Sequence, residues 1–286
     1  MKILITGASG LLGREIMRAF EDHDLTGLSH SREKTGLRQT DLREGIAFRD
    51  LLAELNPDLV INVAAYRDPD YCAENREDAL QLNVEPLHIM ADCLPTETGI
   101  IQISSDYVFD GKNPPYTEDS RRNPVNFYGE TKCLAEDAIA DRDNALSIRI
   151  PVLVGMDDSF EKSGFLYKLV TAARGSEETI LDNAHIRYPT WTRDVARALR
   201  FAVDKRLSGC IHYSGLDGGT QYTLALKVAE LLEQSSANIK PATDPIPRKA
   251  PRPLDSHLSP AKIESLGFDT FTPFAEVCKH IVAGLY

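Results

Sequence analysis

Long apolar runs are absent from this sequence, and so is a leader-like segment ahead of its first apolar stretch. No run approaches the roughly 20 apolar residues that a membrane-spanning helix needs. The chain goes directly into Met1-Lys2-Ile3-Leu4-Ile5, whereas a signal peptide has a charged region, a longer apolar run and a small-residue cleavage site. We therefore expect no transmembrane helix, no signal peptide and a cytoplasmic location.

Cysteine is scarce and poorly placed for metal or disulfide chemistry. The five cysteines are odd in number and far apart, at Cys72, Cys93, Cys133, Cys210 and Cys278. None forms a CxxC pair, and the seven histidines show no metal-ligand spacing. We expect reduced structural thiols and no metal site.

Positive charge is also in short supply. The chain carries 32 Lys and Arg against 43 Asp and Glu, a formal net charge of −11. This balance argues against nonspecific binding to nucleic acid or to an anionic membrane, although a local basic pocket can still hold a phosphate. A length of 286 residues accommodates one large α/β domain with a smaller second lobe.

Short apolar runs alternate with amphipathic stretches in the first half of the chain. Strands are predicted at residues 2–6, 25–29, 59–63, 100–104 and 146–150, and helices at 11–20, 46–55 and 126–140. Residues 70–93 are expected to be mostly helical. Strands that are apolar on both faces, separated by helices, predict a parallel sheet covered on both sides. The expected fold class is α/β, with a Rossmann-type doubly wound parallel sheet in residues 1–155.

The pattern changes after Gly155. Helices are predicted at residues 160–174, 194–203, 259–266 and 273–283, a strand at 210–213, and irregular segments at 180–189 and 240–253. The last of these contains five prolines and is expected to leave the main sheet. We interpret residues 156–286 as mostly a smaller C-terminal substrate lobe, with 190–214 returning to the first domain.

A glycine-rich turn follows the first strand directly. It reads Gly7-Ala8-Ser9-Gly10-Leu11-Leu12-Gly13, with a helix beginning inside it. Gly7 permits a tight turn, Gly10 lets the backbone approach a pyrophosphate, and Gly13 lets the helix pack close to the strand. Because a helix N-terminus also attracts phosphate, we expect Gly7, Ser9, Gly10, Leu11, Leu12 and Gly13 to bind a dinucleotide.

The end of the second strand indicates which dinucleotide is bound. An acidic residue there would favour NAD(H), but the chain reads Ser29-His30-Ser31-Arg32. The hydroxyl of Ser31 and the guanidinium of Arg32 suit a 2′-phosphate, so NADP(H) is favoured and NAD(H) is the alternative. The other interpretation of Arg32 is a solvated surface residue. Asp41 and Leu42 follow the next expected strand, where the carboxylate can reach the adenine.

Three polar residues suggest carbonyl reduction. Tyr128 and Lys132 lie four residues apart in a predicted helix and so share one face. Reduction of a ketone needs a proton donor, and a nearby ammonium is expected to lower the pKa of the phenol. Ser105 ends a predicted strand, at the edge where open α/β sheets hold ligands. A solvated helix-face pair is the alternative interpretation of Tyr128 and Lys132.

Several motifs of this chain also resemble those of extended short-chain dehydrogenase/reductases. The segment from Ile103 to Gly111, then Pro115-Tyr116, Glu118, Pro124, Asn126 and Tyr128-Gly129, is similar to the dTDP-4-dehydrorhamnose reductase branch. The chain also resembles the same branch at Asn62 to Tyr66, at Asn83-Val84, and at Arg252-Pro253 with Leu258. The segments around Arg149 to Val152, Arg187 to Thr190 and Thr272 to Phe274 also resemble the regulatory β subunit of methionine adenosyltransferase.

The resemblance implies roles for individual residues. Ser105 would bind the carbonyl oxygen, Tyr128 would donate the proton, and Lys132 would assist Tyr128 and bind the nicotinamide ribose. The cofactor groove would further be lined by Ala64, Ala65, Tyr66, Asn83, Ser104 and Pro151. Independently of the resemblance, residue type and position suggest that Asp106 and Tyr107 contact the substrate or anchor their loop, and that Arg187 and Arg252 bind a diphosphate or are ordinary surface residues.

Three functions are therefore weighed. The first is an NADPH-dependent reductase of the 4-keto group of a nucleotide-activated deoxysugar, as in dTDP-rhamnose biosynthesis. The second is an NADP-binding regulatory subunit that binds a methionine adenosyltransferase-like enzyme and turns over little. The third is a nucleotide-sugar epimerase or dehydratase. The expected ligand is a nucleotide-sugar or a related small molecule, and the expected assembly is a homodimer or a complex with a partner enzyme.

Overall fold

Seven parallel strands form the central sheet of the computed structural model, which describes residues 1–30, 35–156, 160, 163–244 and 246–283. The strands are β1 (Lys2–Thr6), β2 (Asp24–Ser29), β3 (Leu37–Gln39), β4 (Leu59–Asn62), β5 (Gly99–Ser105), β6 (Ala145–Ile150) and β10 (Gly209–His212). Their order is β10-β6-β5-β4-β1-β2-β3, and every neighbouring pair is parallel. The order reverses between β1 and β4, which opens a crevice at their carboxyl ends. The predicted Rossmann-type sheet is confirmed.

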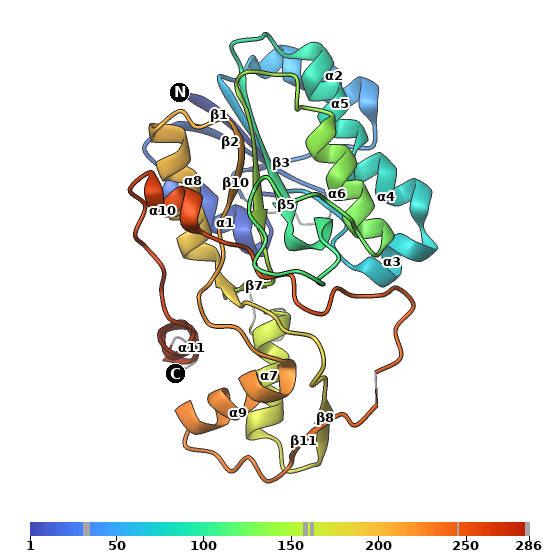
Figure 1. Cartoon of the computed structure of the whole chain (residues 1–286). Coiled ribbons are helices and arrows are strands. Elements are labelled where there is room, and N and C mark those ends of the chain that lie inside the picture. The colour runs from blue at the N-terminus through green and yellow to red at the C-terminus, as the bar shows by residue number, and fades with distance from the viewer. Residues whose placement is uncertain (31–34, 157–159, 161–162, 245, 284–286) are drawn as a thin grey trace.

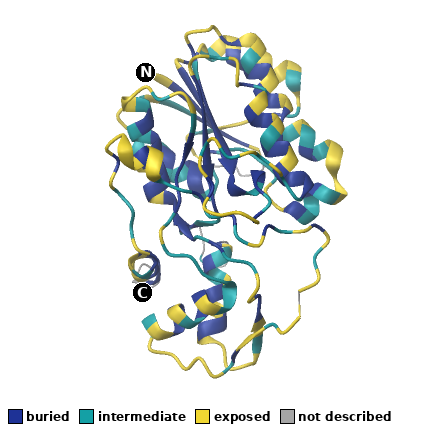
Figure 2. Cartoon of the chain, in the orientation of Figure 1, coloured by how far each residue is buried: buried dark blue, intermediate teal, exposed yellow. Residues whose placement is uncertain are grey.

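Helices cover both faces of this sheet (Figure 1). One face carries α1 (Leu11–Ala19), α8 (Thr192–Asp204) and α10 (Ala261–Ser265), and the other α2 (Gly45–Leu55), α5 (Glu85–Cys93) and α6 (Phe127–Asp137). The central strands β4, β5 and β6 are almost entirely buried, the edge strand β3 is partly exposed, and the helices are exposed on their outer sides (Figure 2). The carboxyl ends of the strands therefore form the open edge where side chains can meet a ligand.

A second cluster of buried apolar side chains lies below the sheet in Figure 1. Its elements are α7 (Phe165–Arg174), α9 (Gln221–Leu231), α11 (Phe274–Ala283), the paired strands β8 (Thr179–Leu181) and β11 (Ile239–Pro241), and the paired strands β7 (Leu153–Val154) and β9 (Thr190–Trp191). The intervening segment returns to the first layer, because α8 packs on α1 and β10 pairs with β6. We refer to this second cluster and its elements as the lobe.

Several elements differ from the sequence-based prediction. Residues 70–93, expected to be mostly helical, form three separate helices: α3 (Pro69–Glu74), α4 (Arg76–Asn83) and α5. Asn75 and Val84 have non-helical backbone angles at the two junctions, and Pro86 cannot donate a hydrogen bond to the turn before it. Helix α7 begins at Phe165 rather than at residue 160, because Gly164 has a φ of 61°.

Helix α9 is absent from the sequence-based prediction, although its pattern contains the necessary information. Leu224, Ala225, Val228 and Ala229 are buried on one helical face. Thr220 begins the helix with a reciprocal capping box to Thr223. Across the described residues, no helix is long and apolar enough to cross a bilayer.

Candidate active site

The glycine turn lies where the sheet order reverses. Gly7 has a φ of +63°, and a Cβ there would lie 2.9 Å from the backbone nitrogen of Ala64. The hydroxyl of Thr6 accepts hydrogen bonds from the amides of Val63 (3.0 Å) and Ala64 (3.1 Å), so the ends of β1 and β4 are fixed side by side. Gly10, which has no side chain to cap the helix, precedes α1. A turn of this shape exposes backbone donors to an anion.

A cavity of about 810 Å³ opens over this turn and extends across the carboxyl edge of the sheet into the lobe. It brings together most of the predicted cofactor residues: Gly7, Ser9, Gly10, Leu11, Leu12, Asp41, Leu42, Ala64, Ala65, Tyr66, Ser104 and Pro151. It is also lined by Ser105, Tyr128 and Lys132, and by the predicted substrate residues Asp106, Tyr107 and Arg187. Cavities of this size hold ligands as large as a dinucleotide with a small substrate.

Ser105, Tyr128 and Lys132 come to this cavity from two elements. Ser105 ends β5, and its hydroxyl accepts a hydrogen bond from the amide of Tyr107 at 3.2 Å. Tyr128 and Lys132 lie in α6, with the Lys132 Nζ 5.7 Å from the centre of the Tyr128 ring. The ammonium of Lys132 donates to the carbonyl oxygen of Ile103 at 3.0 Å. The helical spacing therefore places both side chains over the end of β5.

Burial dominates the protonation of this pair. It raises the pKa of Tyr128, and the nearby Ser105 hydroxyl only partly offsets this. Burial also lowers the pKa of Lys132 to about 8. The expectation that the pKa of the phenol is brought down was wrong, because desolvation by burial has the largest effect on Tyr128 and raises its pKa. Tyr128 is therefore a neutral phenol at physiological pH, which is the form that can donate a proton.

The part of the cavity where the predicted substrate residues lie contains a buried carboxyl group and a buried guanidinium group. The Asp106 carboxylate accepts hydrogen bonds from the hydroxyls of Ser105 (3.1 Å) and Ser256, and burial raises its pKa. Arg187 is 7 % exposed, and its Nη1 donates to the carbonyl oxygens of Ile186 (2.8 Å) and Pro253 (3.1 Å). Its Nη2 is buried and has no hydrogen-bond partner among the described residues. Buried donors without a partner are rare in folded proteins, so Arg187 is a candidate ligand-binding residue.

Three of the predicted site residues that the structure describes do not line the cavity. Gly13 lies behind the turn, where a Cβ would be 2.3 Å from the carbonyl oxygen of Gly7, so it serves close packing of α1. Asn83 lies behind Tyr66 and exchanges hydrogen bonds with its amide (2.7 Å) and carbonyl (3.0 Å). Arg252 points to α3 and pairs with Asp70 at 2.9 Å. Ser31 and Arg32 lie outside the described residues.

The end of the cavity beyond the carboxyl ends of β2 and β3 holds basic residues that the sequence analysis missed. His30 and Arg43 line the cavity on either side of Asp41. The Arg43 Nη2 lies 2.7 Å and the His30 Nε2 3.3 Å from the Asp41 Oδ2. Arg43 lowers the pKa of Asp41 to about 2, so this carboxylate is ionised and already paired. The position of Arg43 two residues after Asp41 was visible in the sequence, but its approach to the ligand cavity was not.

The lobe end of the cavity adds further polar residues that were not predicted. Lys168 comes from α7, Gln221 begins α9, and Arg248 lies after β11. Arg248 is held by the carboxylate of Asp182, which also accepts from the His185 ring at 2.7 Å. Together with Arg187, these residues give the lobe end a positive character in a chain whose net charge is −11. No local motif connects these residues, since they approach one another only through the fold.

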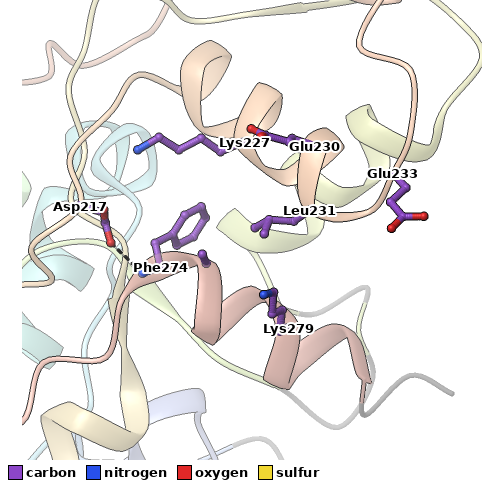
Figure 3. Close-up of a pocket in the computed structure, with 8 residues that line it drawn as sticks. Asp217, Lys227, Glu230, Leu231, Glu233, Phe274 and Lys279 are labelled. Carbon is purple, nitrogen blue, oxygen red and sulfur yellow. Dashed lines mark hydrogen bonds between the residues drawn. The ribbon is translucent and has the colours of Figure 1, made fainter.

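A second hollow of about 590 Å³ lies between α9 and α11 (Figure 3). Lys227 and Lys279 face it together with Glu230 and Glu233, so its charges are mixed. The Asp217 carboxylate caps α11 by accepting from the amide of Phe274 at 2.8 Å. This hollow shares no lining residue with the large cavity. Within the described part of the chain, no group of three or more His, Cys, Asp or Glu is arranged to hold a metal ion.

The sheet order, the glycine turn and the Ser105, Tyr128 and Lys132 cluster define an α/β protein of the extended short-chain dehydrogenase/reductase type. Residues 1–286 match the family described as RmlD substrate binding domain, and the chain belongs to that family. The resemblance inferred from the sequence is thereby confirmed.

Two kinds of curated relative share this family resemblance. Methionine adenosyltransferase 2 subunit beta of Bos taurus is 33 % identical over 282 residues, which is 96 % of this chain and 84 % of the relative. A probable dTDP-4,6-dihydroxy-2-methyloxan-3-one 4-ketoreductase of Streptomyces antibioticus is 33 % identical over 267 residues, 90 % of this chain and 86 % of the relative. Identity alone does not separate a catalytic from a regulatory relative.

Solved structures agree in fold. A hypothetical dTDP-4-dehydrorhamnose reductase from Sulfolobus tokodaii has a TM-score of 0.88 and 29 % identity, covering 97 % of this chain and 99 % of that chain. A dTDP-4-dehydrorhamnose reductase from Bacillus anthracis in complex with NADP has a TM-score of 0.85 and 21 % identity, covering 99 % of each chain. The chain is thus similar throughout its length to reductase-type proteins.

Proposed function

We propose that this protein is an NADPH-dependent reductase of the 4-keto group of a nucleotide-activated deoxysugar. One observation carries the proposal: a single cavity joins the glycine turn to Ser105, Tyr128 and Lys132 and continues to a lobe end rich in basic side chains. A neutral buried phenol beside a buried lysine at the end of β5 is the arrangement that proton donation to a substrate carbonyl requires.

The residues present fit a nicotinamide dinucleotide. Any side chain at Gly7 would collide with the backbone at Ala64, so the turn keeps its space for a pyrophosphate. Ser9 and the backbone from Gly10 to Leu12 would hold the phosphates, and Ala64 to Tyr66 the adenosine half. At the same end of the cavity, the Arg43 guanidinium, which pairs with Asp41, would be the donor to the extra phosphate of NADP(H). The bound cofactor would supply the hydride.

The protein's own groups would handle the oxygen of the substrate carbonyl. The Ser105 hydroxyl would hold that oxygen, and the Tyr128 phenol would donate its proton to it as the carbon is reduced. The carbonyl thereby becomes an alcohol, and Tyr128 regains a proton from solvent. Lys132 is charged at pH values below about 8 and would stabilise the phenolate left after proton transfer.

The lobe end would recognise the rest of the substrate. The unpaired Nη2 of Arg187 is the strongest single indication, because a buried guanidinium nitrogen without a partner is costly. Lys168 and Arg248 line the same end. A nucleoside diphosphate would satisfy these donors, as guanidinium groups bind phosphate with paired hydrogen bonds. This assignment makes residues 156–286 mostly a substrate lobe.

The test is a panel of keto-sugar nucleotides assayed with NADPH and NADH by the absorbance of the reduced nicotinamide. We expect oxidation of NADPH with at least one 4-keto-deoxysugar nucleotide, and slower oxidation of NADH. The matched control replaces each keto-sugar nucleotide by the same keto-sugar without its nucleotide group, with the cofactor still present. Absence of oxidation across the panel, in protein that binds NADPH, would contradict the proposal.

A second function is favoured by the beta-subunit relatives, which match 96 % of the chain at 33 % identity. In this alternative the protein binds NADP and regulates a methionine adenosyltransferase-like enzyme. The test is co-purification with a methionine adenosyltransferase, together with that enzyme's activity with and without this protein. Stable association with no NADPH oxidation would favour the regulatory function, whereas turnover without association would favour the reductase.

A further inference from the structure

Residues 250–256, which we call the strap, connect the lobe to the first layer. They cross the front of the molecule beneath α3 on the way to α10 (Figure 1). The strap lies beside the cavity, but only its neighbour Arg248 lines it. Its residues belong to the irregular, proline-rich part of the chain, so their position depends on specific side-chain contacts.

The strap is attached to α3 chiefly through the carboxylate of Asp70, and the Arg252 Nη2 also lies 3.9 Å from the Oδ1 of Asp68, the N-cap of α3. The Asp70 Oδ1 accepts from the Arg252 Nη1 at 2.9 Å and from the amide of Ala250 at 2.8 Å. The same Nη1 donates to the carbonyl oxygen of Ala250 at 2.6 Å. The Arg252 side chain is only 9 % exposed, so water competes weakly for these hydrogen bonds.

From this attachment the strap reaches the residues of the candidate site. The carbonyl oxygen of Pro251 accepts from the Asn126 Nδ2 at 2.8 Å. Asn126 is the N-cap of α6, and its Oδ1 accepts from the amide of Gly129 at 2.9 Å. Tyr128 lies between these two residues. The strap therefore contacts the cap that fixes the first turn of the helix carrying the phenol.

Two further contacts connect the strap to the substrate side. The carbonyl oxygen of Pro253 accepts from the Arg187 Nη1 at 3.1 Å. The Ser256 hydroxyl donates to the Asp106 carboxylate, which neighbours Ser105. Arg187, Asp106 and the cap of α6 come from three separate parts of the sequence. The strap is the segment that contacts all three.

We propose that Arg252 and Asp70 are positioning residues, which hold the strap so that Tyr128, Asp106 and Arg187 keep their mutual spacing. This inference rests on the proposed reductase function for its kinetic consequence. Arg252 acts through Asn126 and Arg187 and does not touch the substrate. Reaction rates are sensitive to such spacing, since a displacement of about 1 Å can cost about 100-fold.

The chain contains a matched control for this ion pair. Lys249 directly precedes the strap, and its Nζ lies 2.5 Å from the Glu74 Oε1 on the same helix α3. Both side chains of that pair are more than half exposed, at 64 % and 51 %, so the pair should contribute little. Lys249→Gln therefore removes an ion pair between the same two segments without reaching the site.

The first test is hydrogen exchange, which does not depend on any activity. Arg252→Gln should speed exchange at the amides of Ala250 and Gly129 by about tenfold or more, whereas amides in β1 should be unchanged. Lys249→Gln should leave the Gly129 amide unchanged. Asp70→Asn keeps an acceptor oxygen and the size of the side chain, and it carries the test if Arg252→Gln does not fold. Unchanged exchange at Gly129 in a folded variant would overturn the proposal.

The second test is kinetic. With a keto-sugar nucleotide that the wild type reduces, Arg252→Gln should lower kcat by about 10- to 100-fold, with NADPH affinity within twofold of wild type. Arg252→Lys should recover part of the loss, and Lys249→Gln should match wild type. An unchanged kcat, or a loss explained entirely by weaker NADPH binding, would contradict the positioning role. If no substrate is reduced by the wild type, the proposed function fails, and the exchange result still decides the inference.

Discussion

The two sides of the cavity are built in different ways. On the sheet side, the turn after β1 and the ends of β4 and β5 deliver Gly7, Ala64 and Ser105 to one edge through regular parallel pairing. On the lobe side, Arg187, Arg248 and the strap lie in irregular segments held by side-chain hydrogen bonds. The first side is fixed by backbone register, and the second by a small number of individual contacts.

This difference suggests a division of labour. In the proposed reductase, the backbone register of the sheet fixes the parts of the site that are needed whatever the substrate, namely the dinucleotide turn and the proton donor. Loops cross-linked by single side chains can change without disturbing the sheet, so they are suited to selecting the substrate. Substitutions on the sheet side should therefore abolish chemistry or folding, and those on the lobe side should alter substrate binding.

The largest effect is expected for Tyr128→Phe on the sheet side. Loss of the phenolic proton donor should lower kcat by a factor of about 10² to 10⁴, while NADPH binding remains close to wild type. Tyr71→Phe is a matched control, since the Tyr71 hydroxyl donates to Asp78 at 2.7 Å and does not line the cavity. Retained activity in Tyr128→Phe would remove this residue from the mechanism.

Arg187→Gln tests the lobe side. Loss of a charged, buried donor should raise the KM for the nucleotide sugar by roughly 10- to 100-fold, which corresponds to about 1.5–3 kcal/mol. The affinity for NADPH should not change. Arg193→Gln, whose guanidinium is half exposed, should leave both values as they are. Weaker NADPH binding with an unchanged KM for the sugar would reverse the assignment of the two cavity ends.

Gly13→Ala tests how rigidly the sheet side is packed. A Cβ 2.3 Å from the carbonyl oxygen of Gly7 forces α1 away from the turn, and such overpacking costs about 1–3 kcal/mol of unfolding free energy. Gly45→Ala is the control, because there the new Cβ meets only the flexible end of Ile89 at 3.2 Å. Urea unfolding measures both. Equal stability of the two variants would show that the turn tolerates a wider spacing.

The smallest effect is a pH dependence on the sheet side. Burial lowers the pKa of Lys132 to about 8, so its charged form is present below that pH and is lost as the pH rises through it. We expect kcat/KM to fall above pH 8 by up to about tenfold per pH unit. Lys132→Arg keeps the charge and should remove this decline from whatever activity it retains. A profile that stays flat to pH 10 in the wild type would contradict the role of the ammonium.

The sequence contained most of the information needed for the sheet side. The glycine spacing after the first strand, the serine that ends β5 and the four-residue spacing of Tyr128 and Lys132 are local patterns, and all six of these positions except Gly13 line the cavity. The protonation state of Tyr128 was not predictable, because the extent of its burial depends on α3, α4 and the loop at Tyr107.

The lobe side was largely beyond prediction. Arg187 was correctly expected near the cavity. Arg252 was grouped with Arg187 on residue type alone, but in the structure Arg252 pairs with Asp70 instead. Arg43, Lys168 and Arg248 approach the cavity from three unrelated elements, and no local pattern encodes such an approach. Helix α9 is different, since its capping residue and buried face are readable in the sequence.

The central claim is that a dinucleotide lies across the carboxyl edge of the sheet with its reactive ring beside Tyr128. A crystal structure of the protein with NADP⁺ tests it most directly. The account predicts the pyrophosphate at residues 7–12, the 2′-phosphate near His30 and Arg43, and the nicotinamide within reach of Tyr128 and Lys132. Density for the cofactor elsewhere, or a nicotinamide directed away from Tyr128, would contradict it.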